Sequence, residues 1–382
     1  MTPGYKNVFT KRTLAPGSDN AFAKVKENLK TMDEIERIKK LSDLFGPSGF
    51  EDDVAEFVKE EIKELNPVED HMRNVTAVLN PSKDKPKVML DCHMDEVGVI
   101  VQAVKPNGTM KFLTLGGMAA NNLPSDAFVL KNKDGKLVKT VVANKPVHFM
   151  SAAERNQGVD LDSLVLDCGS SSKKETEESF RLGIASPGVP DVQCVYDEEH
   201  HIFHGKAFDN RVGTAAQIET LKRLAGEELP CEVQASFAVQ EEVGERGVMA
   251  NYNVLKPDVM IAFEGCPADD TFSEEYMIQA GLHKGPMLRH FDVSMITSPR
   301  FQRFALDLAE KYGIPVQESV RKGGGTNAGK VHLMGVPCIV IGVPVRYIHS
   351  SNCIMALEDY ENAVKLAVEL CRHLDKETVG SF

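Results

Sequence analysis

The sequence feature that most constrains the fold is an alternation of strand-like and helix-like segments, which a run of short strand candidates interrupts. Amphipathic helical patterns alternate with apolar strand patterns before residue 98 and again after about residue 200. Between them lie short strand candidates, separated by turn signals such as "KPNGT" and "NKDGK". Alternating strands and helices predict an α/β domain, whereas short and closely spaced strands predict a small β-rich domain. We therefore expect an α/β domain in two sequence segments, with a β-rich domain inserted between them.

The domain boundaries follow from this pattern. Residues 1–31 are polar, mildly basic and poorly periodic, which predicts an N-terminal arm. Residues 32–97 and 201–382 form the expected α/β domain, and residues 98–200 form the expected insertion. A chain of 382 residues also exceeds the usual size of a single hydrophobic core, so its length favours two domains.

Charge and cysteine usage narrow the class of protein. The formal net charge of −12 argues against nucleic acids and anionic membranes as partners, because both are negatively charged. No apolar run reaches the length of a transmembrane helix, and the N-terminus lacks the apolar core of a signal peptide. The eight cysteines are scattered and form no CxxC pair, which is typical of reduced intracellular proteins. We therefore expect a cytoplasmic protein.

Polar residues recur where the apolar, strand-like runs end. In open α/β sheets, ligands bind at the carboxyl ends of the strands. Taken singly, each such residue has an ordinary explanation, as a histidine at the rim of the core, an aspartate that caps a helix or a solvated pair of glutamates. Their recurrence instead indicates one site. The residues are His93, Asp95, Glu96, Asp209, Glu241, Glu242, Glu264 and His349.

This set of side chains predicts a metal site. Buried carboxylates repel one another unless they are protonated or neutralised by cations. Two divalent metal ions would neutralise them. A mixture of imidazole and carboxylate ligands suits Zn²⁺, with Co²⁺ or Mn²⁺ as substitutes.

Glu241 and Glu242 are adjacent in "FAVQEEVGERG", directly after an apolar run. Neighbouring side chains point in opposite directions in an extended segment, so we expect the two not to bind one ion together. A two-metal hydrolase needs both a metal ligand and a general base near the attacking water. One glutamate for each role would explain the pair.

The chain resembles the M42 family of metallopeptidases, aminopeptidases that form tetrahedral assemblies. The motifs that carry the resemblance span roughly residues 33–375, and their order and spacing are specific. They are "GPSGFED", "CHMDEVG", "LGGM", "KPVHFM", "AFDNRVG", "QEEVGERG", "GGGTNAG" and "RYIHS". The resemblance implies an α/β fold in which a mixed-sheet, dinuclear-metal peptidase domain carries an inserted β-rich dimerisation domain.

The resemblance also implies a role for each site residue. His93 and Glu264 bind the first metal, Glu242 and His349 bind the second, and Asp209 bridges both. Glu241 is the general base, and Asp95 orients the His93 ring. The implied activity is removal of the N-terminal residue from short peptides by a homo-oligomer, either a dimer or a tetrahedral dodecamer.

Two positions depart from the family pattern. Glu264 stands where aspartate is frequent, and a glutamate there still binds metal. Asn327 stands in "GGGTNAG" where we expect aspartate, which removes a charge near the site and leaves the preferred substrate open. His148 and His332 are expected to be structural rather than metal ligands.

Three other functions compete with this hypothesis. "GGGTNAG" loosely fits a dinucleotide-binding pattern, but the preceding "VQESVRK" is too polar for the apolar strand such a site needs. A metal-stabilised, non-enzymatic assembly protein would have no use for a spare base such as Glu241. A glycoside hydrolase usually presents aromatic platforms to the sugar, and this chain has no tryptophan.

Overall fold

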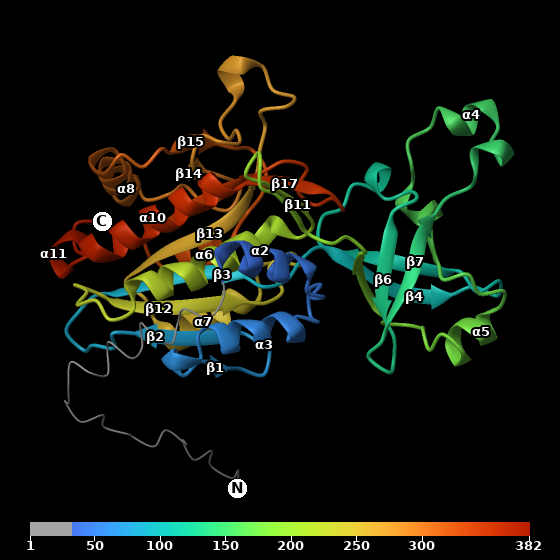
Figure 1. The fold of residues 1–382 in the computed structure, drawn as a ribbon, viewed down its shortest axis with the longest axis horizontal. Coiled ribbons are helices and arrows are strands. Elements are labelled where there is room, and N and C mark those ends of the chain that lie inside the picture. Colours follow the sequence, from blue (N-terminus) through green and yellow to red (C-terminus); the bar gives the residue numbers. More distant parts are fainter. Residues whose placement is uncertain (1–32) are drawn as a thin grey trace, which may run out of the picture.

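The structure is a computed structural model that describes residues 33–382. The N-terminal arm expected at residues 1–31 therefore lies outside the described residues. Figure 1 shows a large body of helices packed on a sheet, with a smaller lobe of strands to one side of it. Among residues 33–382, no helix is long and apolar enough to cross a membrane.

The large body is built on a mixed sheet of eight strands. Its four central strands, β12, β3, β13 and β16, run parallel, and antiparallel or short strands flank them. This order brings the carboxyl ends of the four central strands to one edge of the sheet. In spatial order the strands are β1 (Val68–Glu69), β2 (Val75–Leu79), β12 (Glu232–Ala238), β3 (Lys87–His93), β13 (Val259–Pro267), β16 (Cys338–Val345), β14 (Met287–Phe291) and β15 (Gln317–Val320).

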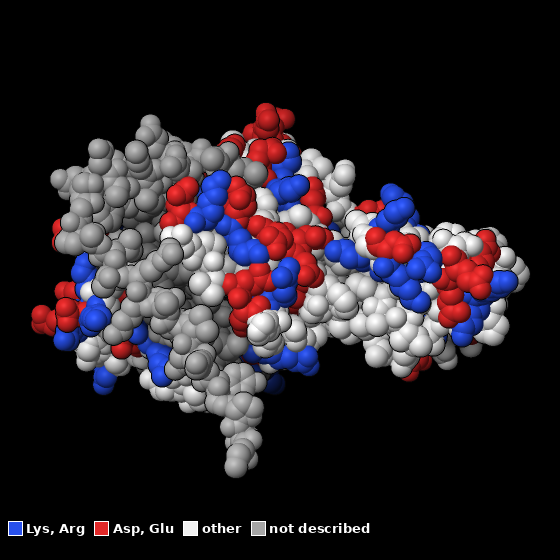
Figure 2. Space-filling model, turned by 90° about the horizontal axis from the view of Figure 1, so that it is seen from below, with Lys and Arg blue, Asp and Glu red and all other residues white. Residues whose placement is uncertain are grey.

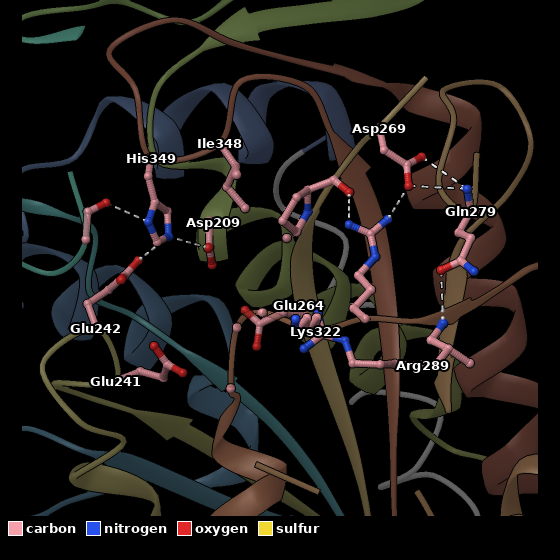
Figure 3. A pocket seen from close by; sticks show the side chains of 18 of the residues that line it. Asp209, Glu241, Glu242, Glu264, Asp269, Gln279, Arg289, Lys322, Ile348 and His349 are labelled. Carbon is pink, nitrogen blue, oxygen red and sulfur yellow. Dashed lines mark hydrogen bonds and ion pairs between the residues drawn. The ribbon is translucent and has the colours of Figure 1, made fainter. Parts of the chain in front are cut away.

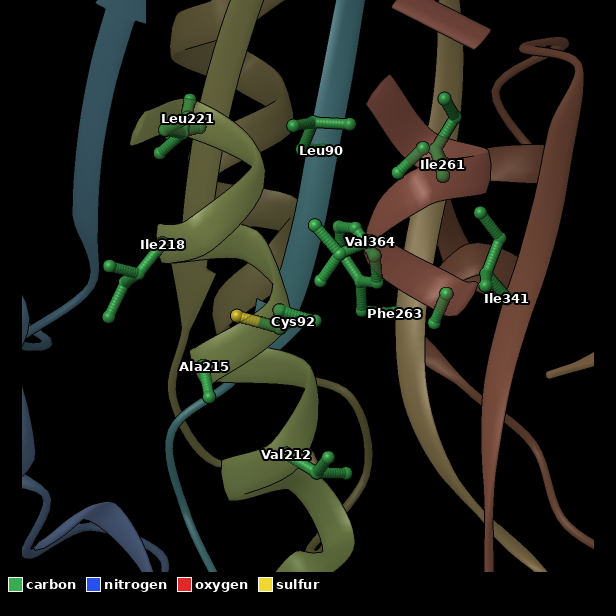
Figure 4. Close-up of a cluster of buried hydrophobic side chains, with 14 of the residues drawn as sticks. Leu90, Cys92, Val212, Ala215, Ile218, Leu221, Ile261, Phe263, Ile341 and Val364 are labelled. Carbon is green, nitrogen blue, oxygen red and sulfur yellow. The ribbon is translucent and has the colours of Figure 1, made fainter. Parts of the chain in front are cut away.

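Both faces of the central strands are buried, which explains the long apolar runs in β13 and β16. In β3, Val88, Leu90 and Cys92 point into the larger core, and Met89 points into a smaller core on the other face. Figure 4 shows part of the larger core, where side chains of α6 and α10 meet those of β3, β13 and β16.

Helices cover both faces of the sheet. Helices α2, α3, α6, α8 and α10 pack over the larger core, and α7 and α9 pack over the smaller one. The ends of α8 follow from its sequence, because Pro299 occupies the first turn and Gly313 ends the helix with φ +62°. The helices are α2 (Glu34–Asp43), α3 (Asp52–Glu61), α6 (Phe208–Leu224), α7 (Gly247–Leu255), α8 (Pro299–Tyr312), α9 (Asn327–His332), α10 (Leu357–His373) and α11 (Lys376–Val379).

The smaller lobe is a closed barrel whose interior is an apolar core of its own. It carries two short helices, α4 (Ala152–Arg155) and α5 (Lys173–Glu178). Figure 2 shows acidic and basic side chains interspersed over the described part of one face of the molecule, on the lobe and the large body alike. The barrel strands, in spatial order, are β4 (Gly98–Val104), β5 (Met110–Leu115), β8 (Val165–Asp167), β7 (Leu137–Ala143), β6 (Ala127–Lys131) and β9 (Pro187–Pro190).

A third, antiparallel sheet lies where the chain returns from the lobe to the large body. Its strands β10 and β11 precede α6, and β17 precedes α10. Figure 1 shows β11 and β17 beside each other on the side of the body that faces the lobe. The strands are β10 (Val195–Asp197), β11 (Ile202–Gly205) and β17 (Cys353–Ala356).

The predicted α/β alternation and the run of short strands are both confirmed by the structure. The sequence patterns did not predict α7, α9, β14 or β15. The polar stretch "VQESVRK" contains a strand, since Gln317–Val320 form β15. Its polar sequence suits its place, since β15 is an edge strand with mostly exposed side chains.

Candidate active site

The predicted site residues meet at the carboxyl ends of the central parallel strands, around a cavity of about 910 Å³. Of the seven residues predicted to bind metal or catalyse, six line this cavity, and Asp95 lies behind its wall. Figure 3 shows this cavity with its side chains. The six lining residues are His93, Asp209, Glu241, Glu242, Glu264 and His349.

Backbone geometry aims these side chains into the cavity. His93 is the last residue of β3, and Glu264 lies inside β13 near its carboxyl end. Asp209 stands at the start of α6 with a non-helical backbone (φ −85°, ψ 107°). His349 follows β16 in a loop and adopts φ +58°, a conformation that costs free energy in a residue with a side chain.

Asp209 lies between the two histidines. Its Oδ1 atom is 3.1 Å from His93 Nε2, and its Oδ2 atom is 3.1 Å from His349 Nε2. Glu264 Oε1 lies 3.2 Å from His93 Nε2, and Glu242 Oε1 lies 3.2 Å from His349 Nε2. Two groups of three potential ligands result, His93–Asp209–Glu264 and Asp209–Glu242–His349, and they share Asp209.

The electrostatics of this cluster fit the binding of cations. Burial raises the pKa of Glu264 to about 8 and also raises the pKa of Glu242. Glu242 Oε1 and Glu264 Oε1 are buried oxygens that accept no hydrogen bond within the described residues. Burial lowers the pKa of His349, but the neighbouring carboxylates of Asp209 and Glu242 outweigh it and raise this pKa to about 11. Divalent cations between these groups would replace the protons that so many buried carboxylates otherwise require.

Glu241 belongs to neither of these two groups. Its Oε2 atom lies 3.9 Å from His93 Nε2, and together with His93 and Glu242 it forms a third group of potential ligands. Burial, which is the largest effect, raises the pKa of Glu241 well above its usual range. A buried carboxyl group with a raised pKa has the property expected of a general base or acid near neutral pH.

The structure corrects the explanation given for the adjacent glutamates. Strand β12 ends at Ala238, Gln240 adopts φ +56°, and Glu242 begins a turn. The pair is therefore not extended, and strand alternation does not separate the two side chains. The turn brings both carboxylates into the same cavity, where Glu242 approaches His349 and Glu241 approaches His93.

Two buried carboxylates hold this turn through three successive backbone amides. Gln240 N donates to Glu51 Oε1 (3.0 Å), Glu241 N donates to Asp95 Oδ1 (3.0 Å), and Glu242 N donates to Asp95 Oδ2 (3.1 Å). Ser48 Oγ donates to Asp95 Oδ2 (2.6 Å). We call the side chains of Ser48, Glu51 and Asp95 the turn clamp. It fixes the backbone from which both cavity glutamates project.

Asp95 also contacts the His93 ring, whose Nδ1 atom lies 3.4 Å from Asp95 Oδ1 and 3.1 Å from the Asp95 carbonyl oxygen. The sequence did not identify Ser48 and Glu51 as site residues, although both lie in "GPSGFED". An acidic residue just before a helix is usually a cap or a partner of the helix dipole, so nothing in the pattern singled out Glu51.

Asn327 lies beneath the site rather than in it. It is buried, does not line the cavity, and its Nδ2 atom donates to Asp91 Oδ2 (2.9 Å). The amide that replaces the expected aspartate therefore contacts a buried carboxylate of β3. His148 and His332 do not line the cavity either.

Comparisons with known proteins identify the family to which this chain belongs. A family model described as M42 glutamyl aminopeptidase matches residues 73–366. A glutamyl aminopeptidase from Lactococcus lactis is 31% identical over 357 residues, which cover 92% of this chain and 99% of that protein. A lysyl aminopeptidase from Pyrococcus furiosus is 31% identical over 353 residues, which cover 90% of this chain and 98% of that protein.

Solved structures agree with the sequence relatives. A TET aminopeptidase from a marine sediment archaeon of the Thaumarchaeota superimposes with a TM-score of 0.87 at 35% identity, covering 91% of this chain and 98% of that one. The TET1 peptidase of Pyrococcus horikoshii, described as able to assemble into a tetrahedron or a large octahedral shell, gives a TM-score of 0.80 at 28% identity over 90% of this chain and all of that one. The chain belongs to the M42 family of peptidases and is an aminopeptidase.

Proposed function

We propose that this aminopeptidase removes the N-terminal residue of short peptides with two divalent cations bound per subunit. His93, Asp209 and Glu264 would hold the first cation, and Asp209, Glu242 and His349 would hold the second. The observation that carries this proposal is the position of Asp209, whose two oxygens each face a different histidine at 3.1 Å. The family match favours this function over the glycoside hydrolase and the non-enzymatic assembly protein.

The donor atoms favour zinc. Each group combines one imidazole nitrogen with carboxylate oxygens, a set that suits Zn²⁺ and also accepts Co²⁺ or Mn²⁺. When bound, the cations would polarise the scissile carbonyl group and lower the pKa of the attacking water.

Glu241 is the proposed general base, because the two groups that share Asp209 are complete without it. Its carboxylate would accept a proton from the attacking water and pass it to the leaving amine. Asp95 serves catalysis indirectly, since it orients His93 and holds the backbone amides of Glu241 and Glu242. The free α-amino group of the substrate would lie near the second cation or an adjacent carboxylate.

Cleavage of matched peptides with free and acetylated N-termini tests this function. We expect hydrolysis of the free peptide from its N-terminus and little or no hydrolysis of the acetylated one. Equal cleavage of both peptides, or release of residues only from the C-terminus, would contradict the proposal.

We propose that the catalytic domain comprises residues 32–97 and 201–382, and that residues 98–200 serve dimerisation. The barrel carries large apolar side chains on its surface, among them Leu113, Leu137 and Phe149, the last of which is 73% exposed. Structural neighbours include TET peptidases that assemble into tetrahedral or octahedral shells, which supports a homo-oligomer here. A cytoplasmic location is also proposed, and the eight cysteines, none in a disulfide, fit a reducing compartment.

A further inference from the structure

Glu96 belongs to the polar set that the sequence predicts but, like Asp95, it does not line the cavity. Its side chain is 1% exposed, and its two carboxylate oxygens accept hydrogen bonds from Lys206 Nζ at 2.8 and 2.7 Å. Its Oε1 atom also accepts a hydrogen bond from Arg211 Nη2 at 3.0 Å. Lys206 and Arg211 are buried as well. We call Glu96, Lys206 and Arg211 the junction cluster, to which the proposed mechanism gives no role.

The junction cluster joins the two chain segments that carry proposed ligands of the first cation. Glu96 lies three residues after His93, in the segment that leads from β3 to the barrel strand β4. Lys206 lies three residues before Asp209, and Arg211 lies two residues after it, in the segment that leads from β11 into α6. His93 and Asp209 are 116 positions apart in the sequence, yet their side chains approach to 3.1 Å. This distance therefore depends on how the two segments are held together.

Arg211 ties further backbone to the same point. A guanidinium group has five N–H donors, and each of those of Arg211 has an acceptor. Its Nε atom donates to the carbonyl oxygen of Met94 (2.8 Å), the residue directly after His93. The remaining acceptors are Glu96 and three carbonyl oxygens at the end of α2 and in the loop after it, those of Leu41 (2.7 Å), Leu44 (3.1 Å) and Gly46 (3.1 Å). The planar guanidinium fixes the directions of these bonds, so it holds the segments in one relative position.

The carboxylate of Glu96 is suited to this link because it has two acceptor oxygens. Both contact Lys206 Nζ, and one of them also contacts Arg211. An amide at this position would offer one oxygen and would turn an NH₂ group towards a cation. Glutamine therefore keeps the shape of the side chain but cannot hold both basic residues at once.

We propose that the junction cluster positions His93 and Asp209 so that both reach the first cation. This inference rests on the proposed function, because a cation must lie between these two side chains for their separation to matter. Metal ligands must be held within about 0.5 Å of their productive positions. Loss of the link between β3 and the start of α6 would therefore weaken cation binding, although no member of the junction cluster touches the cation.

A second buried ion cluster provides a matched control. Glu61 Oε2 lies 2.8 Å from Arg37 Nε and 2.7 Å from Lys222 Nζ, and all three side chains are at most 7% exposed. This cluster again combines one glutamate with one arginine and one lysine. Lys222 lies in the last turn of α6, about 20 Å from the first turn, which carries Asp209. Glu61→Gln thus makes the same chemical change far from the proposed cation site.

The test measures zinc affinity by competition with a fluorescent chelator of known zinc affinity. Replacement of a group that orients a metal ligand lowers metal affinity by about 10- to 100-fold. We therefore expect Glu96→Gln to bind at least one of the two zinc ions about tenfold or more weakly than wild type. Glu61→Gln should lose stability in urea unfolding and keep the zinc affinity of wild type.

The double variant Glu96→Gln/Lys206→Met separates positioning from stability. Replacement of both partners of a buried ion pair by neutral groups of similar volume is often neutral for stability. We expect the double variant to recover stability relative to Glu96→Gln, while its zinc affinity stays about tenfold or more below that of wild type. It also serves in place of Glu96→Gln if the single variant does not fold.

Three results would overturn the proposal. Wild-type zinc affinity in the double variant would show that the junction cluster does not position the ligands, and would leave the aminopeptidase intact. An equal loss of zinc affinity in Glu61→Gln would assign the effect to general destabilisation. Failure of wild type to bind zinc would remove the proposed cation site and, with it, the role of the junction cluster.

Discussion

Replacement of Glu51 tests whether the turn clamp supports catalysis. Glu51 Oε1 accepts hydrogen bonds from Gly49 N (2.8 Å) and Gln240 N (3.0 Å), and the side chain is 1% exposed. Glu51→Ala leaves both amides without this partner. At about 1–3 kcal/mol for each unsatisfied donor, we expect a loss of about 2–6 kcal/mol in the free energy of unfolding. The turn that carries Glu241 should also shift, and a displacement of about 1 Å lowers turnover by about 10²-fold.

Glu51→Gln is the matched control for this experiment. Its amide oxygen can accept the same two hydrogen bonds, while the variant removes a carboxylate near Asp95. Burial, followed by the charge of Asp95, raises the pKa of Glu51 to about 7 from a usual value of 4.5. A carboxyl group with a raised pKa binds protons more tightly in the folded state, so its contribution to stability falls as the pH rises from about 4.5 to about 7.

Glu51→Gln and wild type therefore differ in their pH dependence. A shift of this size corresponds to about 3 kcal/mol at most. The free energy of unfolding of Glu51→Gln relative to wild type should rise across the window from pH 4.5 to 7 and stay constant above it. Urea unfolding at several pH values measures this difference, and kcat with a p-nitroanilide measures the catalytic effect. If Glu51→Ala keeps wild-type stability and turnover, or if Glu51→Gln is as impaired as Glu51→Ala, the turn clamp does not support catalysis.

Four further predictions concern the cations and the assembly. Glu242→Gln should lower the zinc content measured by atomic absorption, and added zinc should partly restore activity, because an amide is a weaker ligand than a carboxylate. Glu241→Gln should keep its zinc and lose about 10²-fold or more in turnover, and a loss of zinc only in Glu241→Gln would reverse the two roles. Removal of zinc by a chelator should lower the melting temperature, and zinc should restore it, since a bound ligand stabilises the folded state; an unchanged melting temperature would contradict binding at this site. Light scattering of the zinc-loaded protein should give a multiple of the 42.0 kDa chain mass, up to twelve copies, whereas a monomer mass would refute the oligomer.

The sequence predicts that the residues of the proposed cation site lie close together, because parallel strands converge. Once β3, β12 and β13 are recognised as neighbouring buried strands, the polar residues at their carboxyl ends must lie near one another. His93 and Glu264 illustrate this, since their strands are adjacent and their side chains lie 3.2 Å apart. Asp209 and His349 reach the same place from the start of a helix and from a loop. The sequence pattern could flag these two residues, but it could not predict the distances.

The cavity-lining residues Arg289 and Lys322 were not predicted because they lie on elements with weak patterns. Arg289 belongs to β14, whose five residues show no regular alternation of buried and exposed side chains. Lys322 follows β15, whose exposed position at the edge of the sheet permits a polar sequence. Periodicity reports burial on one face, so it fails for short strands at the edge of a sheet.

The adjacent glutamates show most clearly what a pattern leaves out. Two neighbouring carboxylates after a buried strand indicate a site, but strand alternation would send them in opposite directions. The chain instead ends β12 early and turns at Gln240, so both side chains enter one cavity. That turn requires partners for three consecutive amides, and these come from Glu51 and Asp95, which lie about 150 to 190 positions away in the sequence. Because the partners are distant carboxylates, the turn and the placement of the two cavity glutamates depend on tertiary contacts that no local pattern records.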